Sequence, residues 1–131
     1  MSISLQQYYD ELIRAAGDGT FPGTMSEENN YCTMRRVREN KTVAKCAIGI
    51  RLPEHVLDQL EEDELLHEEV TEIDEAIITK YFPTELSLED ISDIQSSHDT
   101  ASEFGWDRSK FIHMINGLGC FDGVEKYTSD L

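Results

Sequence analysis

Acidic residues fill one continuous stretch of the sequence, and this stretch restricts how the chain can fold. Eleven Asp or Glu residues lie between Pro53 and Ala76, and no Lys or Arg occurs from Leu52 to Thr79. Opposite charges three or four positions apart stabilise a helix by ~0.2–0.5 kcal/mol, and like charges cost about as much. A helix in this stretch forgoes that gain. We therefore expect its apolar stripe to face the core and its carboxylates to face solvent.

The acidic stretch makes the charge of the chain uneven as well as large. Residues 1–52 include 7 basic and 6 acidic residues, whereas residues 53–131 include 4 basic and 21 acidic ones, within a net charge of -16. A field of this sign disfavours nucleic acid and anionic membranes as partners, and it speeds the encounter with a basic surface. The expected partner is therefore a protein with a basic surface.

The sequence also bears on location. It contains no apolar run near the ~20 residues that a membrane-spanning helix needs. Its beginning, MSISLQQYYDELIRA, has neither the basic nor the apolar region of a signal peptide. We expect a cytoplasmic protein, in which the three cysteines stay reduced.

Apolar residues recur at helical spacing in five parts of the chain. The segment GDGTFPG (17–23) ends the first part, and FPTELS (82–87) separates the third from the fourth. Ser87, with Asp90 three residues later, and Asp107 are typical N-cap residues, and Trp106 and Phe111 are spaced as a hydrophobic staple. The predicted helices cover residues 4–16, a short stretch from 53 to 60, residues 66–81, residues 88 to about 105, and residues 107–118.

Residues 31–51 have a different, strand-like character. YCTMRRV and TVAKCAIGI favour extended structure, and RENK between them favours a turn. The pattern predicts a β-hairpin, although CAIGIRL is also compatible with a short buried helix before Pro53. We expect a mainly helical α+β fold, with about five helices and one small β-hairpin after the first helix. It would form a single acidic globular domain of residues 1–131, with a loose tail at 120–131.

Two cysteines flank the basic part of this segment, and they raise the hypothesis of a metal or thiol site. A zinc site needs four N or S ligands, and neither Cys32 nor Cys46 has a second ligand beside it. A role in the core is therefore favoured, and the same holds for His98 on the apolar face of its predicted helix. We predict no metal, no cofactor and no catalytic residue. A thiol- or metal-dependent enzyme that uses Cys32, Cys46 and His98 together is the enzymatic alternative.

Positive charge is concentrated at Arg35, Arg36, Arg38 and Lys41. These side chains could pair with the acidic helices of the same molecule, with a second copy in a homo-oligomer, or with an anionic ligand. Pairing within the molecule is the favoured interpretation. The alternative is a binding module for a small ligand, such as a nucleotide signal, whose phosphates these residues would contact.

The acidic stretch supports the main functional hypothesis. Carboxylates at helical spacing can approximate the charge density of a nucleic-acid backbone. They could serve only to keep the protein in solution, or they could enter a basic groove of a partner. The candidate partner-binding residues are Glu61, Glu62, Asp63, Glu64, Glu68, Glu69, Glu72 and Glu75.

Two stretches taken together, YCTMRRVRENKTVAKCAIGIRLP and DIQSSHD, resemble a diffuse group of small, largely uncharacterised bacteriophage and prophage proteins. The resemblance covers roughly residues 31–118. The turn here is longer and more basic than in the group, and the acidic stretch after Pro53 is exaggerated. The matching positions are Cys32, Cys46, Ala47, Ile48, Gly49, Leu52, Ile94, Gln95, His98 and Asp99.

The resemblance implies an origin in a mobile element, and it carries no established activity. Small acidic phage proteins often inhibit host nucleases or defence complexes by binding them, which is an argument by analogy. By that analogy, the chain is expected to be a non-enzymatic protein of the host cytoplasm. It would mimic nucleic acid and inhibit a basic nucleic-acid-binding or defence protein.

Overall fold

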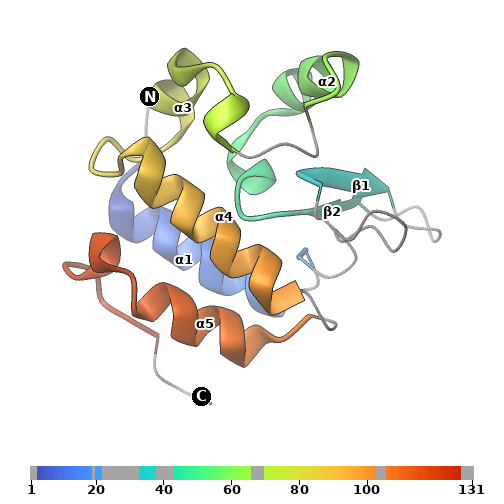
Figure 1. Cartoon of the computed structure of the whole chain (residues 1–131). Helices are drawn as coiled ribbons and strands as arrows, with labels where there is room; N and C mark the ends of the chain where they lie inside the picture. The colour runs from blue at the N-terminus through green and yellow to red at the C-terminus, as the bar shows by residue number, and fades with distance from the viewer. Residues whose placement is uncertain are drawn as a thin grey trace.

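The computed structural model describes residues 3–18, 20–21, 33–37, 43–65, 70–102 and 106–127. This part of the chain is mainly helical, as predicted, and contains five α-helices. It also contains two short strands and three turns of 3₁₀ helix (Figure 1). The elements are α1 (Leu5–Gly17), β1 (Arg35–Val37), β2 (Val43–Lys45), η1 (Gly49–Arg51), α2 (Glu54–Glu62), η2 (Val70–Glu72), α3 (Glu75–Tyr81), α4 (Leu88–Ser102), α5 (Arg108–Asn116) and η3 (Gly119–Phe121).

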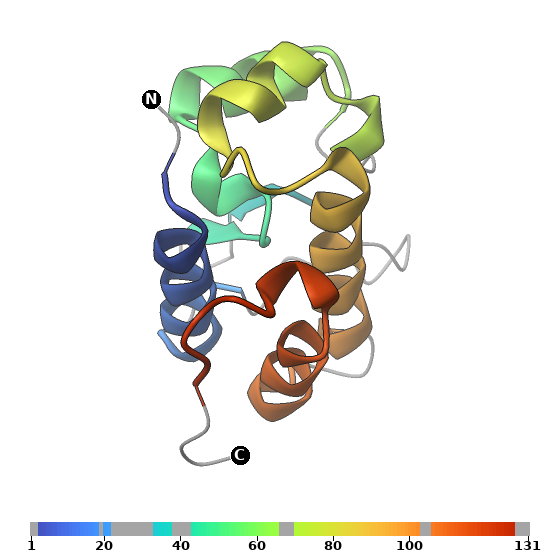
Figure 2. The ribbon, with the colours of Figure 1, turned by 90° about the vertical axis from the view of Figure 1, so that its left-hand side faces the viewer.

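Helices α1, α4 and α5 enclose the lower part of the core. Figure 2 shows α1 and α4 on opposite sides with α5 below them, and α5 contacts both. Helix α1 begins with a capping box. The backbone amide of Gln7 donates to Ser4 Oγ at 3.1 Å, and the backbone amide of Ser4 donates to Gln7 Oε1 at 3.0 Å. Its buried residues are Tyr8, Tyr9, Leu12, Ala15 and Ala16, which lie on one face at helical spacing.

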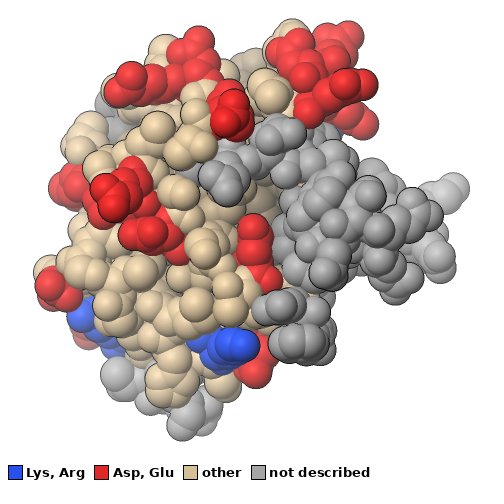
Figure 3. Space-filling view, viewed as in Figure 1, with Lys and Arg blue, Asp and Glu red and all other residues tan. Residues whose placement is uncertain are grey.

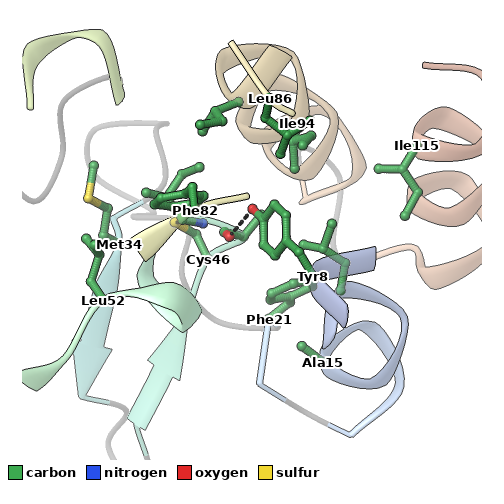
Figure 4. Close-up of a cluster of buried hydrophobic side chains, with 14 of the residues drawn as sticks. Tyr8, Ala15, Phe21, Met34, Cys46, Leu52, Phe82, Leu86, Ile94 and Ile115 are labelled. Carbon is green, nitrogen blue, oxygen red and sulfur yellow. Dashed lines mark hydrogen bonds between the residues drawn. The ribbon is translucent and has the colours of Figure 1, made fainter. Parts of the chain in front are cut away.

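In the central part of the core, α1 packs against the residues that follow β2 and against the end of α3. The ring of Tyr8 meets that of Phe82 edge to face, with centroids 5.5 Å apart. The Tyr8 hydroxyl donates a hydrogen bond of 2.7 Å to the carbonyl oxygen of Ala47 (Figure 4). One aromatic side chain therefore connects three elements that lie far apart in the sequence.

The two strands pair antiparallel, with Arg35 opposite Lys45 and Val37 opposite Val43. Residues 38–42, which would close a hairpin, lie outside the described part of the chain, so the predicted turn stays a prediction. Within CAIGIRL, residues Gly49–Arg51 form the 3₁₀ turn η1, which ends two residues before Pro53.

The predicted continuous helix over residues 66–81 is wrong. Residues 66–69 are not described, and the remaining part consists of η2 and α3 with a break between them. At the break, the Asp74 carboxylate accepts a 2.9 Å hydrogen bond from the Ala76 amide, which makes Asp74 the N-cap of α3. An Asp side chain competes with helical backbone bonds in this way. Ile73 is buried just before the cap, so the apolar spacing spans two short elements.

The predicted caps of the last two long helices are confirmed. Before α4, the Ser87 amide donates to Asp90 Oδ2 at 2.9 Å, and the Asp90 amide donates to Ser87 Oγ at 3.1 Å. Before α5, Asp107 Oδ1 accepts from the Lys110 amide at 3.0 Å. Trp106 and Phe111 are in ring contact, with centroids 5.4 Å apart, as expected of a staple.

Residues 120–127 are held against α1, so the expectation of a loose tail is wrong for them. Phe121 is fully buried and its ring contacts that of Tyr9. The Tyr127 amide donates to the Tyr9 hydroxyl at 2.8 Å, and the Glu125 amide donates to Gln6 Oε1 at 2.7 Å. A ring contact and two hydrogen bonds from tail backbone amides to side chains of α1 therefore connect the tail to this helix. Residues 128–131 lie outside the described part.

Candidate functional site

The predicted partner-binding residues do not share one helix. Glu61 and Glu62 end α2, and Asp63 and Glu64 form the turn after it. Glu72 ends η2, and Glu75 begins α3. Glu68 and Glu69 fall outside the described residues. Figure 3 shows acidic side chains gathered over α2 and over η2 and α3, at two corners of the same upper face. We define the acidic surface as eight of these described and exposed residues: Glu54, Asp58, Glu61, Glu62, Asp63, Glu64, Glu72 and Glu75.

Sequence reasoning missed two members of this surface, Glu54 and Asp58. Together with Glu61 they lie at the i, i+4 and i+7 positions of one side of α2. Arg35 of β1 contacts all three. Its Nη1 lies 2.7 Å from Glu54 Oε2 and 2.9 Å from Asp58 Oδ1, and its Nη2 lies 2.8 Å from Glu61 Oε2. The i, i+4, i+7 spacing was the signal in the sequence that could have grouped these carboxylates.

This cluster brings three exposed carboxylates into contact with one guanidinium group. The Arg35 side chain is only 12% exposed, whereas those of Glu54, Asp58 and Glu61 are 62–69% exposed. Lys45 of β2 adds a 2.6 Å contact to Glu54 Oε1. Hydrogen bonds from Lys45 and Arg35 lower the pKa of Glu54, so its carboxylate stays ionised at neutral pH.

The cations under the acidic surface neutralise only part of it. Arg35 and Lys45 are two positive charges against the three carboxylates of the cluster. Within the described residues, no ion pair involves Glu62, Asp63 or Glu64. The surface as a whole is therefore negative.

The prediction that basic residues pair within the molecule is confirmed for Arg35. Three carboxylates surround its guanidinium, which disfavours the anion-binding alternative at this residue. The side chain of Arg36, and residues Arg38 and Lys41, lie outside what the structure describes. Anion binding by these three stays a prediction.

Cys46 is a buried core residue. Its Sγ accepts hydrogen bonds from the amides of Ile48 at 3.4 Å and Gly49 at 3.5 Å, and only 2% of the residue is exposed. Burial raises the pKa of the thiol to about 12. A thiol with this pKa stays protonated at neutral pH, and the thiolate is the nucleophilic form. The structure therefore opposes a role for Cys46 as a nucleophile.

His98 is fully buried among aromatic rings. Its ring centroid lies 4.9 Å from that of Phe21 and 5.5 Å from that of Trp106, and its Nδ1 lies 3.2 Å from Asp99 Oδ1. Cys32 lies outside the described residues, so the convergence of Cys32, Cys46 and His98 stays a prediction. Among the residues that are described, no group of three or more His, Cys, Asp or Glu side chains could hold a metal ion.

A groove of about 440 Å³ lies between α2 and α3, and sequence reasoning did not find it. Ile77 of α3 follows the break at Asp74 and is half-buried at the groove. The side chains that line the groove are His55, Val56, Gln59, Leu60, Asp63, Leu65, Asp74 and Ile77.

A second hollow of about 390 Å³ lies between α1 and the tail. Its charged lining residues are Asp10, Arg14, Glu125 and Lys126, in which the two signs balance. It therefore shows no preference for a charged ligand.

No helix in the described ranges has both the length and the apolar character needed to cross a membrane.

Comparisons with models of protein families, with curated protein sequences and with solved structures found no match for this chain. The resemblance to bacteriophage proteins stays a prediction. The acidic surface and the groove beside it are thus the features from which a function has to be argued.

Proposed function

We propose that the protein is a non-enzymatic interaction protein whose acidic surface occupies a basic site of a partner protein. In doing so it competes with nucleic acid for that site. If the resemblance to bacteriophage proteins holds, the partner is a nucleic-acid-binding or defence protein of the host. The observation that carries the proposal is the Arg35 cluster, which orders exposed carboxylates along α2.

Preordered carboxylates are suited to binding. Fixing a long flexible side chain at an interface costs roughly 0.5–1.5 kcal/mol, and side chains already held by Arg35 need less of this ordering. Exposed ion pairs, in contrast, each contribute about 0–1 kcal/mol to folding. The arrangement therefore lowers the cost of binding a partner.

The charge density of α2 is also close to that of a nucleic-acid strand. Four carboxylates lie between Glu54 and Glu62 of α2, a span of about 12 Å at 1.5 Å per helical residue. That is one charge per ~4 Å before Arg35 and Lys45 are counted, compared with ~3.4 Å for one strand of B-DNA. A basic groove built for phosphates would meet a similar field.

The experiment compares two charge-reversal variants of equal net charge. One changes Glu62, Glu64, Glu72 and Glu75 to Lys, which leaves the Arg35 cluster intact. The control changes Glu85, Glu89, Asp93 and Asp122 to Lys. These four residues are exposed outside the acidic surface. Partners are captured from lysate with the wild-type protein, and the captured protein is then titrated with each variant and with competing duplex DNA over a range of salt concentrations.

We expect the first variant to bind at least about tenfold more weakly at low salt, and the control to bind almost as the wild type does. Duplex DNA should displace the wild-type protein. Equal losses in both variants would mean that net charge alone acts, and unchanged binding with a flat salt response would remove the proposal.

A further inference from the structure

We infer that the groove between α2 and α3 receives an apolar side chain from a basic, amphipathic segment of the partner. The inference rests on the proposed function and adds to it the kind of segment that is recognised. It assigns to the partner both a positive charge, for the acidic surface, and an apolar side chain, for the groove.

The interior of the groove is apolar, and the described residues cover it incompletely. Val56 and Leu60 of α2 form its most buried part, with 9% and 4% of their area exposed. Leu65 and Ile77 line it as half-buried side chains. A partner side chain placed here would remove further apolar surface from water, which is favourable in proportion to the area buried.

The rim of the groove is acidic. The Asp63 carboxylate accepts hydrogen bonds of 3.3 Å from the Gln59 amide group, and Asp74 accepts from the Ala76 amide. Both carboxylates thus have neutral donors, and the structure records no ion pair for either among the described residues. Glu62 and Glu64 are exposed nearby on α2 and the turn after it. A Lys or Arg next to the apolar side chain would therefore find complementary charge at the rim.

The position of the groove favours a peptide segment over an enclosed small molecule. Small-ligand sites bury most of their ligand. Here the polar lining residues His55, Gln59, Asp63 and Asp74 are exposed, and the walls are the sides of two helices. An amphipathic helix laid into a groove between helices is a common mode of peptide recognition.

The two parts of such an interface respond differently to salt. Attraction between the acidic surface and a cationic segment weakens as the Debye length falls from ~30 Å at 0.01 M to ~3 Å at 1 M ionic strength. Burial of an apolar side chain does not weaken in this way. Affinity that remains at high salt therefore reports on the groove.

The test uses three synthetic helical peptides of equal length and equal charge. The first carries Lys with Leu along one face, the second has the same composition with Leu dispersed around the helix, and the third has Ala in place of every Leu. Affinity is measured by fluorescence anisotropy at low and high salt. Methyl resonances of Val56, Leu60, Leu65 and Ile77 report whether the groove is occupied.

Three variants locate the binding. Gln59→Trp places a large side chain at the exposed rim of the groove, and Ile77→Ser removes part of its wall. Ile13→Ser is the matched control, because Ile13 is a half-buried isoleucine of α1 outside the groove. Thermal unfolding of each variant shows that it is folded, and the two groove variants change the groove in opposite ways, so a folding defect in one leaves the other informative.

We expect the first peptide to bind at least about tenfold more tightly than the third at high salt, with shifts of the groove methyls. Gln59→Trp and Ile77→Ser should abolish this advantage, and Ile13→Ser should keep it. If all three peptides bind equally at low salt and none binds at high salt, the inference is wrong and the proposed function stands. If none binds even at low salt, both fail.

Discussion

At the scale of single residues, Gly49 has the least room for a side chain among the described glycines. A Cβ atom built on Gly49 would lie 2.0 Å from the backbone carbonyl oxygen of Met34 and 2.9 Å from its carbon. These are backbone atoms, so they cannot turn aside as a flexible side chain could. The close approach brings η1 against the residue that precedes β1, and it explains why glycine is needed here.

Gly49→Ala should therefore lower the free energy of unfolding by about 3 kcal/mol, because the chain must shift to remove the overlap. Urea unfolding followed by circular dichroism measures the change. Gly119→Ala is the matched control, since nothing lies within 4 Å of a Cβ at that position, and it should change stability by less than about 0.5 kcal/mol. Equal effects of the two substitutions would contradict the close approach at Gly49.

Tyr8 carries a buried hydroxyl with one partner, the carbonyl oxygen of Ala47. Tyr8→Phe keeps the ring contact with Phe82 and leaves that carbonyl without its donor. We expect a loss of about 1–2 kcal/mol in the free energy of unfolding, measured by urea unfolding. Tyr81→Phe serves as the control, because the described contacts include no hydrogen bond to the Tyr81 hydroxyl. A neutral result for Tyr8→Phe would show that water can replace the bond.

Cys46 should resist alkylation in the folded protein. Its pKa of about 12 lies above the ordinary thiol value of 9.0, so the protonated thiol stabilises the fold below about pH 9. That contribution is lost as the pH rises toward 12. At pH 8, mass spectrometry after iodoacetamide treatment should find Cys46 labelled only when the chain unfolds. The half-buried Cys120 should react sooner. Fast labelling of native Cys46 would instead reveal access to solvent.

At the scale of elements, the end of α2 contains an unusual choice of residue. The Leu65 amide donates to the Leu60 carbonyl at 2.8 Å and the Glu64 amide donates to that of Glu61 at 3.1 Å, which is the pattern of a Schellman motif. Glu64 occupies the position where glycine is preferred, with φ of 60°. The motif brings Leu60 and Leu65 together in the groove, so the strained turn also forms part of its wall.

Glu64→Gly should raise the free energy of unfolding by about 0.5–1 kcal/mol, because glycine adopts this backbone conformation without strain. Glu64→Ala is the matched variant, since it removes the same carboxylate and keeps the Cβ atom. The difference in thermal unfolding between the two variants isolates the backbone effect. If Ala stabilises as much as Gly, relief of charge repulsion is the cause and the strain is negligible.

At the scale of the whole molecule, the net charge of -16 works against compactness. Figure 3 shows the few basic side chains of this face at its lower end, away from the acidic corners. Like charges that face solvent repel one another, and salt screens them. Salt also weakens the attraction within the Arg35 cluster, which lowers stability, but this cluster includes only two cations.

Raising NaCl from about 0.01 M to about 0.15 M, which shortens the Debye length from ~30 Å to ~8 Å, should therefore raise the melting temperature. Differential scanning calorimetry measures the shift. The variant with Glu62, Glu64, Glu72 and Glu75 changed to Lys should show a smaller rise, because its net charge is halved. A melting temperature that falls with salt would mean that ion pairs outweigh the repulsion.

Local patterns were sufficient for much of the helical architecture. The buried stripe of α1, the caps at Ser87 and Asp107 and the contact of Trp106 with Phe111 depend on residues within one or two turns. The helix over residues 66–81 was predicted wrongly because apolar spacing alone cannot show a break. Asp74 marked that break, but an Asp within a helical pattern is equally compatible with an exposed position.

The sequence by itself determined which residues face the core within each long helix and where the negative charge lies, because both depend on neighbours along the chain. Only the tertiary structure decided that Arg35 would order the carboxylates of α2, that Tyr9 would hold Tyr127, and that α2 and α3 would leave a groove. Tyr9 and Tyr127 are separated by 118 residues. The physical reason is that such contacts form only when distant segments are packed together, and their energies depend on geometry that no local pattern contains.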